Sequence, residues 1–166
     1  GTSSPVGKLS ISGTTATNEA SHVTFQNTSG AKIFAVGGGK SGVSNNGFNI
    51  VNVTDNTAPL TISDSGNVGI GVVPESDLNT ATYSNLRIGL SGLLQANISG
   101  HQTLLGSNYK VGNLGNEYIS TGTAARYMQA QGAHYFSVAP SGSADAAISF
   151  TNAMTIGNTG ALESFA

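Results

Sequence analysis

Carboxylate side chains are the first groups to examine for catalysis, because hydrolysis of a glycosidic bond usually needs two of them about 5 to 10 Å apart. The chain has only eight acidic residues in 166. Most have turn-like neighbours, as where Asp64 precedes Ser65 and Gly66. The full supply is Glu19, Asp55, Asp64, Glu75, Asp77, Glu117, Asp145 and Glu163. This pattern predicts no catalytic pair, so a polysaccharide depolymerase ranks last among the functions considered.

Serine nucleophiles depend on a histidine and a carboxylate, and His22, His101 and His134 stand in weak surroundings for that role. His22 and His134 fall on expected strands, which favours a surface or interface position, and no G-x-S-x-G motif occurs. In a trimer, three copies of either residue could meet on the axis and bind a metal or an anion. The chain has no cysteine. The prediction is therefore a protein that is not an enzyme, with no catalytic residue, metal or cofactor.

Tyrosines among neutral polar residues can bind carbohydrate, because their rings stack on sugars while amides and hydroxyls form hydrogen bonds. Tyr109, Tyr118 and Tyr127 lie in the second half of the chain and are the candidate glycan contacts. The neutral polar residues around them are His101, Gln102, Asn108, Asn113, Asn116 and Gln129. The pattern favours the other interpretation, in which these tyrosines pack at strand edges or at contacts between subunits.

The composition is polar but almost uncharged. Charged residues make up 8% of the chain, against roughly 25% in an average soluble domain, and glycine reaches 23 residues. Neutral polar surfaces suit extracellular or virion proteins. A net charge of −2 with six Lys and Arg residues argues against nucleic acid as a partner, and no apolar run approaches the roughly 20 residues of a membrane span.

Short alternations of apolar and polar residues predict β-strands throughout. They occur at 8–12, 22–26, 48–53, 60–63, 86–88 and 154–156, and a one-residue slip at Val51 suggests a β-bulge. Turn compositions rich in Gly and Asn separate them, at 27–30, 64–67 and 157–160. The segment 37–42 lacks the full spacing of a phosphate-binding loop and is interpreted as a flexible hairpin loop. Only 121–131 offers a helical spacing, as a minor alternative to a strand.

Three landmarks recur in the same order in both halves, which predicts two tandem β repeat modules. Segment 1–11 is echoed by 71–88, Ala31–Val36 by Ala133–Val138, and Leu60–Gly66 by Met154–Gly160. We place the modules at 1–70 and 71–166, with an insertion at about 90–121 in the second.

The phrase Asp64-Ser65-Gly66-Asn67-Val68-Gly69-Ile70-Gly71, followed by Pro74, resembles a phrase that recurs in tail fibres and tail spikes of tailed bacteriophages. Two residues precede Pro74 where three are common. Segment 1–9 is similar to the end of the phrase and Met154–Gly160 to its beginning. In such proteins the phrase separates β-rich shaft modules that assemble as trimers.

Strands this short cannot build a wide sheet alone, whereas three chains wound together can supply edge strands to one another. We therefore expect an all-β fold in an elongated, intertwined homotrimeric fibre. The resemblance implies a structural segment of a phage tail fibre in the virion, outside the cell, which supports or forms the part that binds the host receptor. Its expected partners are further copies of itself, other tail or baseplate proteins and bacterial surface polysaccharide, without membrane insertion. A carbohydrate-binding receptor module is the main alternative.

Overall fold

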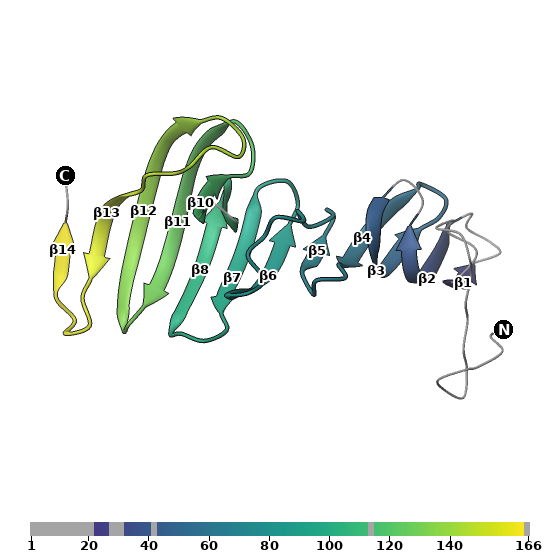
Figure 1. Ribbon diagram of the computed structural model, residues 1–166, viewed down its shortest axis with the longest axis horizontal. Coiled ribbons are helices and arrows are strands. Elements are labelled where there is room, and N and C mark those ends of the chain that lie inside the picture. The colour runs from purple at the N-terminus through teal and green to yellow at the C-terminus, as the bar shows by residue number, and fades with distance from the viewer. Residues whose placement is uncertain (1–21, 27–31, 41–42, 113–114, 165–166) are drawn as a thin grey trace. The chain divides into compact units, whose positions relative to one another are not determined.

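The computed structural model describes residues 22–26, 32–40, 43–112 and 115–164, and its ribbon is drawn in Figure 1. The predicted all-β class is confirmed, since every regular element among these residues is a strand. Contacts divide the chain into two compact units, 1–73 and 74–166. The sequence placed the boundary near residue 71.

The first unit is an antiparallel meander in which each strand pairs with the next along the chain. The predicted bulge at Val51 is confirmed, because the register between the third and fourth strands shifts between Ile50 and Asn52. The segment 37–42, expected to be a loop, begins instead as part of the second strand, which runs to Lys40. The strands are β1 (His22–Gln26), β2 (Ile33–Lys40), β3 (Val43–Asn52), β4 (Thr57–Ile62) and β5 (Val68–Ile70).

The second unit contains a seven-stranded antiparallel arrangement in the order β6-β7-β8-β11-β12-β13-β14 and a separate two-stranded ribbon, β9 with β10. The helical alternative at 121–131 is wrong, because those residues form β11 between β8 and β12. The strands are β6 (Tyr83–Ile88), β7 (Gly92–Asn97), β8 (Gln102–Ser107), β9 (Tyr109–Gly112), β10 (Gly115–Tyr118), β11 (Gly122–Ala130), β12 (Ala133–Gly142), β13 (Thr151–Ile156) and β14 (Leu162–Ser164).

The predicted turns at 64–67 and 157–160 are confirmed and have the same geometry. Gly66 and Gly160 have φ angles of 85° and 83°, a region that glycine occupies without strain. The Gly66 amide donates to the Ser63 carbonyl at 3.0 Å, and the Gly160 amide donates to the Gly157 carbonyl at 2.9 Å. The hairpins β4–β5 and β13–β14 that these turns join are therefore built alike.

The core of the second unit lies between the β9–β10 ribbon and one face of the sheet. Tyr109 and Tyr118 from the ribbon pack with residues of β8, β11 and β12, and the segment before β13 contributes Ile148. Gly106 makes room for this packing, since a Cβ there would lie 2.5 Å from the Tyr109 ring. The buried cluster is Leu104, Tyr109, Val111, Tyr118, Ala124, Ala139 and Ile148. The ribbon thus covers one face of the sheet.

Candidate functional site

Several of the alternating strands bury polar side chains on one face and leave apolar side chains exposed on the other. In the first unit Asn49 and Thr61 are fully buried, while Phe25 is 60% exposed. In the second unit Arg87 is 1% exposed and its neighbour Ile88 is 48% exposed. Period-two alternation puts the two kinds of residue on opposite faces of a sheet. The face that is more open to solvent is therefore the apolar one in both units.

Apolar side chains form a continuous line across the open face of the first unit. Successive pairing partners join one residue from each strand, so the five side chains lie side by side. We call Val23, Val36, Ile50, Leu60 and Ile70 the first apolar row. Val23 and Ile70, at its two ends, are 42% and 46% exposed.

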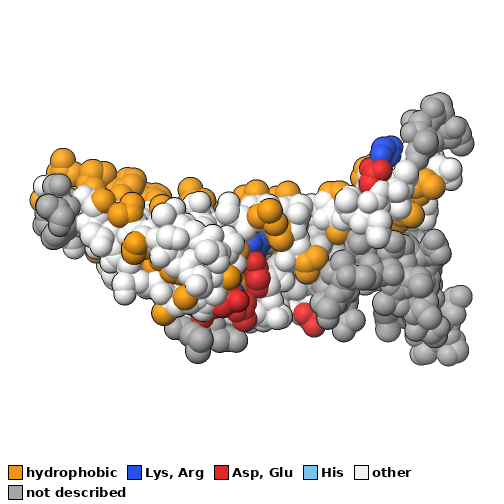
Figure 2. Space-filling view, turned by 90° about the horizontal axis from the view of Figure 1, so that it is seen from above, with side chains coloured by type: hydrophobic (Ala, Val, Ile, Leu, Met, Phe, Trp, Pro, Cys, Tyr) orange, Lys and Arg blue, Asp and Glu red, His pale blue; other side chains and the backbone are white. Residues whose placement is uncertain are grey.

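A second line of the same kind crosses six strands of the second unit. Pairing partners from β6 to β13 define this second apolar row, which is Leu86, Leu94, Leu105, Tyr127, Phe136 and Met154. Leu105 is 55% exposed and Phe136 39%. None of the side chains described on this face belongs to Lys, Arg, Asp or Glu. In Figure 2 hydrophobic side chains line much of the upper edge of the view, where one blue and red pair also lies at the right, and further acidic side chains gather around blue atoms nearer the middle.

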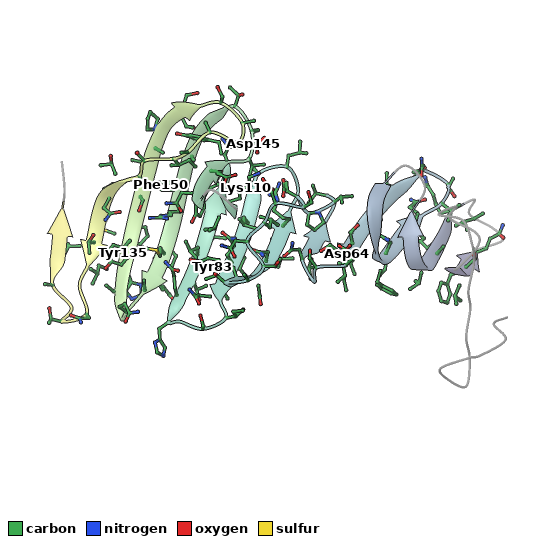
Figure 3. The ribbon with its side chains drawn as sticks, viewed as in Figure 1. Asp64, Tyr83, Lys110, Tyr135, Asp145 and Phe150 are labelled. Carbon is green, nitrogen blue, oxygen red and sulfur yellow. The ribbon has the colours of Figure 1, made fainter. Side chains whose placement is uncertain are left out.

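The opposite, covered face of the second unit holds a buried ion cluster around Lys110, labelled in Figure 3. The Lys110 Nζ lies 2.7 Å from an Asp77 oxygen, 2.8 Å from an Asp145 oxygen and 3.7 Å from a Glu117 oxygen. Burial alone would lower the pKa of Lys110, but its hydrogen bonds to Asp145 and Asp77 and their charges raise it above the usual value. The ammonium group therefore stays charged and holds three segments together.

Arg87 forms a second buried ion pair on this face. Its guanidinium group donates to both carboxylate oxygens of Glu75, at 2.7 and 2.8 Å, and to the Gly92 carbonyl at 2.7 Å. Such two-pronged pairs fix geometry as well as charge. Together with the Lys110 cluster, this pair ties the segment that precedes β6 to the strands.

The three carboxylates around Lys110 approach one another within 4.8 Å, a spacing that suits a cation. The Lys110 ammonium group, however, lies among them and supplies a positive charge. Because Lys110 contacts all three carboxylates, the four side chains form a structural ion cluster. Other acidic residues stand apart: Asp64 is exposed in its turn, and Asp55 pairs with the exposed Lys32, a contact that lowers the Asp55 pKa.

Two of the three tyrosines predicted to contact glycans lie in the core. Tyr109 is 0% exposed and Tyr118 is 4% exposed, and the Tyr118 hydroxyl donates to the Pro140 carbonyl at 2.6 Å. Burial, only partly offset by Arg126, raises the pKa of Tyr109. Stacking on a sugar is not available to these two rings, because the β9–β10 ribbon folds them against the sheet.

The third predicted residue, Tyr127, lies within the second apolar row. Its ring stacks on Phe136 at 4.9 Å between centroids and on His134 at 5.9 Å. Gln129 donates to the Tyr127 hydroxyl at 2.9 Å, and the same hydroxyl meets His134 Nδ1 at 2.5 Å.

Two shallow grooves flank the hairpin between β11 and β12. The His134 groove, of about 400 Å³, is lined by Ala96, Asn97, Gly100, His101, Gln102, Thr103, Gln129, Ala130, Gly132, Ala133 and His134. The Thr155 groove, of about 360 Å³, is lined by Gln131, Ala133, Tyr135, Asn152, Thr155, Gly157 and Asn158. His101 and His134 therefore line one groove, whereas the side chain of His22 lies outside the described residues. None of the described residues that line the two grooves is a Lys, Arg, Asp or Glu.

Comparisons with family models, with curated proteins and with solved structures give no match to this chain. The described residues contain no helix with the length and apolar character that a membrane span requires.

Proposed function

We propose that the chain is a structural segment of a bacteriophage tail fibre that assembles as a homotrimer through its two apolar rows. The observation that carries the proposal is that each unit leaves the apolar face of its strands more open to solvent than the opposite face. An exposed, contiguous apolar patch on a soluble protein marks an interaction site. The phrase at 64–71, similar to one in phage fibres, supports the assignment to a fibre and the number three.

A second copy of the same chain is the partner that this face fits best. In the second unit this face carries no described Lys, Arg, Asp or Glu, so identical faces can approach without repulsion between like charges. Covering a half-exposed Leu or Phe contributes about 1 kcal/mol, half of the value for full burial. Leu94, Leu105, Phe136 and Val138 together would then contribute roughly 4 kcal/mol per chain in the second unit alone. Three copies arranged around a threefold axis would cover the apolar face of each copy.

Molar mass measured by light scattering on the size-separated protein tests the assembly. We expect a trimer at micromolar concentration for the wild type. Leu105→Glu places a charge in the middle of the second apolar row and should yield monomers. Thr159→Glu adds the same charge at an exposed turn and should leave the trimer intact.

Specific association should be detectable at about 50 µM. A wild-type chain that is folded and monomeric at that concentration would refute self-association. A trimer unchanged by Leu105→Glu would show that association uses another surface. Virion placement has a separate test: antibodies against the chain should label the tail fibres of the phage that encodes it under electron microscopy, and labelling of any other structure would contradict the assignment.

A further inference from the structure

His134 lies on the open face of the second unit, directly beside the second apolar row. It stands two residues before Phe136 on β12, so both side chains project from the same face of the sheet. Successive pairing partners place it in a neighbouring row, which is Ala96, Thr103, Gln129, His134 and Ile156. Residues two apart along a strand are about 7 Å apart. A partner chain that covers Phe136 therefore also reaches His134.

The side chain of His134 is held in place by Tyr127. The two rings stack at 5.9 Å between centroids, and Nδ1 of His134 lies 2.5 Å from the Tyr127 hydroxyl. An imidazole nitrogen accepts a hydrogen bond when it is bare and donates one when it is protonated, and a hydroxyl can take either part. The contact is therefore compatible with both charge states of His134, so a change of charge does not by itself disrupt the fold.

Among the side chains that the structure describes, none beside His134 carries a charge that could pair with an imidazolium. The side chains around it on this face are Gln129 and Tyr127 from β11, Ile156 and Met154 from β13, and Leu162 from β14. The turns 131–132 and 157–161 contain no Lys, Arg, Asp or Glu. Glu163, on β14, pairs with Thr155 and is therefore out of register with this row. The other titratable residue of the His134 groove is His101, which is exposed.

We propose that protonation of His134 dissociates the trimer and leaves the chain folded, so that assembly through the open face depends on pH. The inference rests on the trimer proposed above. Histidine is the side chain that ordinarily gains its charge between about pH 8 and about pH 5. An imidazolium at this position contacts water in a monomer, whereas a partner chain would cover it with an apolar face that offers no counter-charge. Assembly therefore favours the neutral imidazole and is lost as the pH falls.

The size of the effect follows from the number of protons that the chains take up. If each chain binds one proton when the trimer dissociates, the association constant falls about tenfold per chain, or about a thousandfold, for each pH unit. That constant contains the monomer concentration to the third power, so the concentration at half assembly rises about 30-fold for each pH unit.

Light scattering on the size-separated full chain at about pH 8 and about pH 5 measures the assembly, and far-ultraviolet circular dichroism measures the fold. His134→Gln keeps a side chain that forms hydrogen bonds and cannot become charged, whereas His134→Lys is charged at both pH values. His101→Gln and His101→Lys are the matched controls, since His101 lines the same groove but is exposed and precedes β8.

We expect the wild type and both His101 variants to be trimers at about pH 8 and to need at least a 30-fold higher concentration, of the order derived above, for half assembly at about pH 5. His134→Gln should remain a trimer at both pH values, and His134→Lys should be a folded monomer at both. A wild-type trimer that persists at low pH would overturn the inference and leave the proposed assembly in place. So would equal dissociation of His134→Gln, a trimer of His134→Lys, or dissociation that accompanies loss of the β-sheet signal. A wild type that is monomeric at both pH values would refute the assembly itself, and this inference with it.

Discussion

Replacing Lys110 by methionine tests whether the buried ion cluster stabilises the second unit. Methionine has a similar length and no charge, so the change removes three ion pairs while it keeps most of the packing. The carboxylates of Asp77, Glu117 and Asp145 then face one another without a cation among them. The loss of the cation affects the three carboxylates differently, because their side chains differ in exposure to water.

The expected loss follows from the exposure of each carboxylate. Removing one partner of a buried ion pair costs about 3 to 5 kcal/mol. Only Glu117, at 3% exposure, is withdrawn from water, whereas the side chains of Asp77 and Asp145 are 38% and 69% exposed and can turn to solvent. Exposed pairs contribute at most about 1 kcal/mol. We expect Lys110→Met to lower the free energy of unfolding by about 3 kcal/mol, which is roughly a fifth to three fifths of the stability of a typical domain.

Urea unfolding followed by tyrosine fluorescence measures this loss in the right part of the chain. All five tyrosines lie after residue 74, so their signal reports the second unit. The double variant Lys110→Met/Glu117→Gln should recover part of the loss, because an uncharged amide replaces a buried carboxylate that has lost the Lys110 charge. Lys32→Met, at the exposed pair with Asp55, should cost less than about 1 kcal/mol. A loss below about 1 kcal/mol in Lys110→Met, or no recovery in the double variant, would refute the assignment of the cluster as a stabilising element.

Three further outcomes are expected from the same unit, each checked by thermal unfolding. Gly142→Ala should cost about 1 to 3 kcal/mol, because the new Cβ would overlap the Tyr118 ring. Gly160→Ala should cost about 1 kcal/mol through its positive φ alone, since open space surrounds it. Stability should fall above about pH 10, because the pKa values of Tyr109 and Lys110 are raised in the folded state. The folded chain therefore binds more protons than the unfolded chain at that pH. A stability that stays constant from about pH 9 to about pH 12 would contradict both shifts.

Local features of the fold were predictable because they depend on neighbours in sequence. Alternation such as Leu60-Thr61-Ile62 indicates a strand wherever it occurs, and Gly66 and Gly160 each fit a position with positive φ. The slip at Val51 predicted the bulge for the same reason, since one extra residue breaks a period of two. These features depend on the local sequence and not on what covers the strand.

The covered face was not predictable, because alternation distinguishes two faces and does not say which is buried. The acidic residues were interpreted as turn residues for a related reason. Asp77 and Asp145 lie 33 and 35 residues from Lys110 along the chain, so only the folded structure brings them together. One signal was present: Lys110 and Glu117 have opposite charges and pair across the β9–β10 hairpin.

The placement of charge is the strongest physical argument for a partner on the apolar face. The chain has six Lys and Arg residues, and two of them, Arg87 and Lys110, are buried on the covered side. Soluble proteins usually protect an exposed apolar sheet with charges, lysine above all, because an open apolar surface invites uncontrolled association. In the second unit these two charges stabilise the covered face, and none of the described Lys, Arg, Asp or Glu side chains stands on the open face of that unit. In the proposed trimer, copies of the same chain would cover this face as they fold, and assembly would then be part of the folded state.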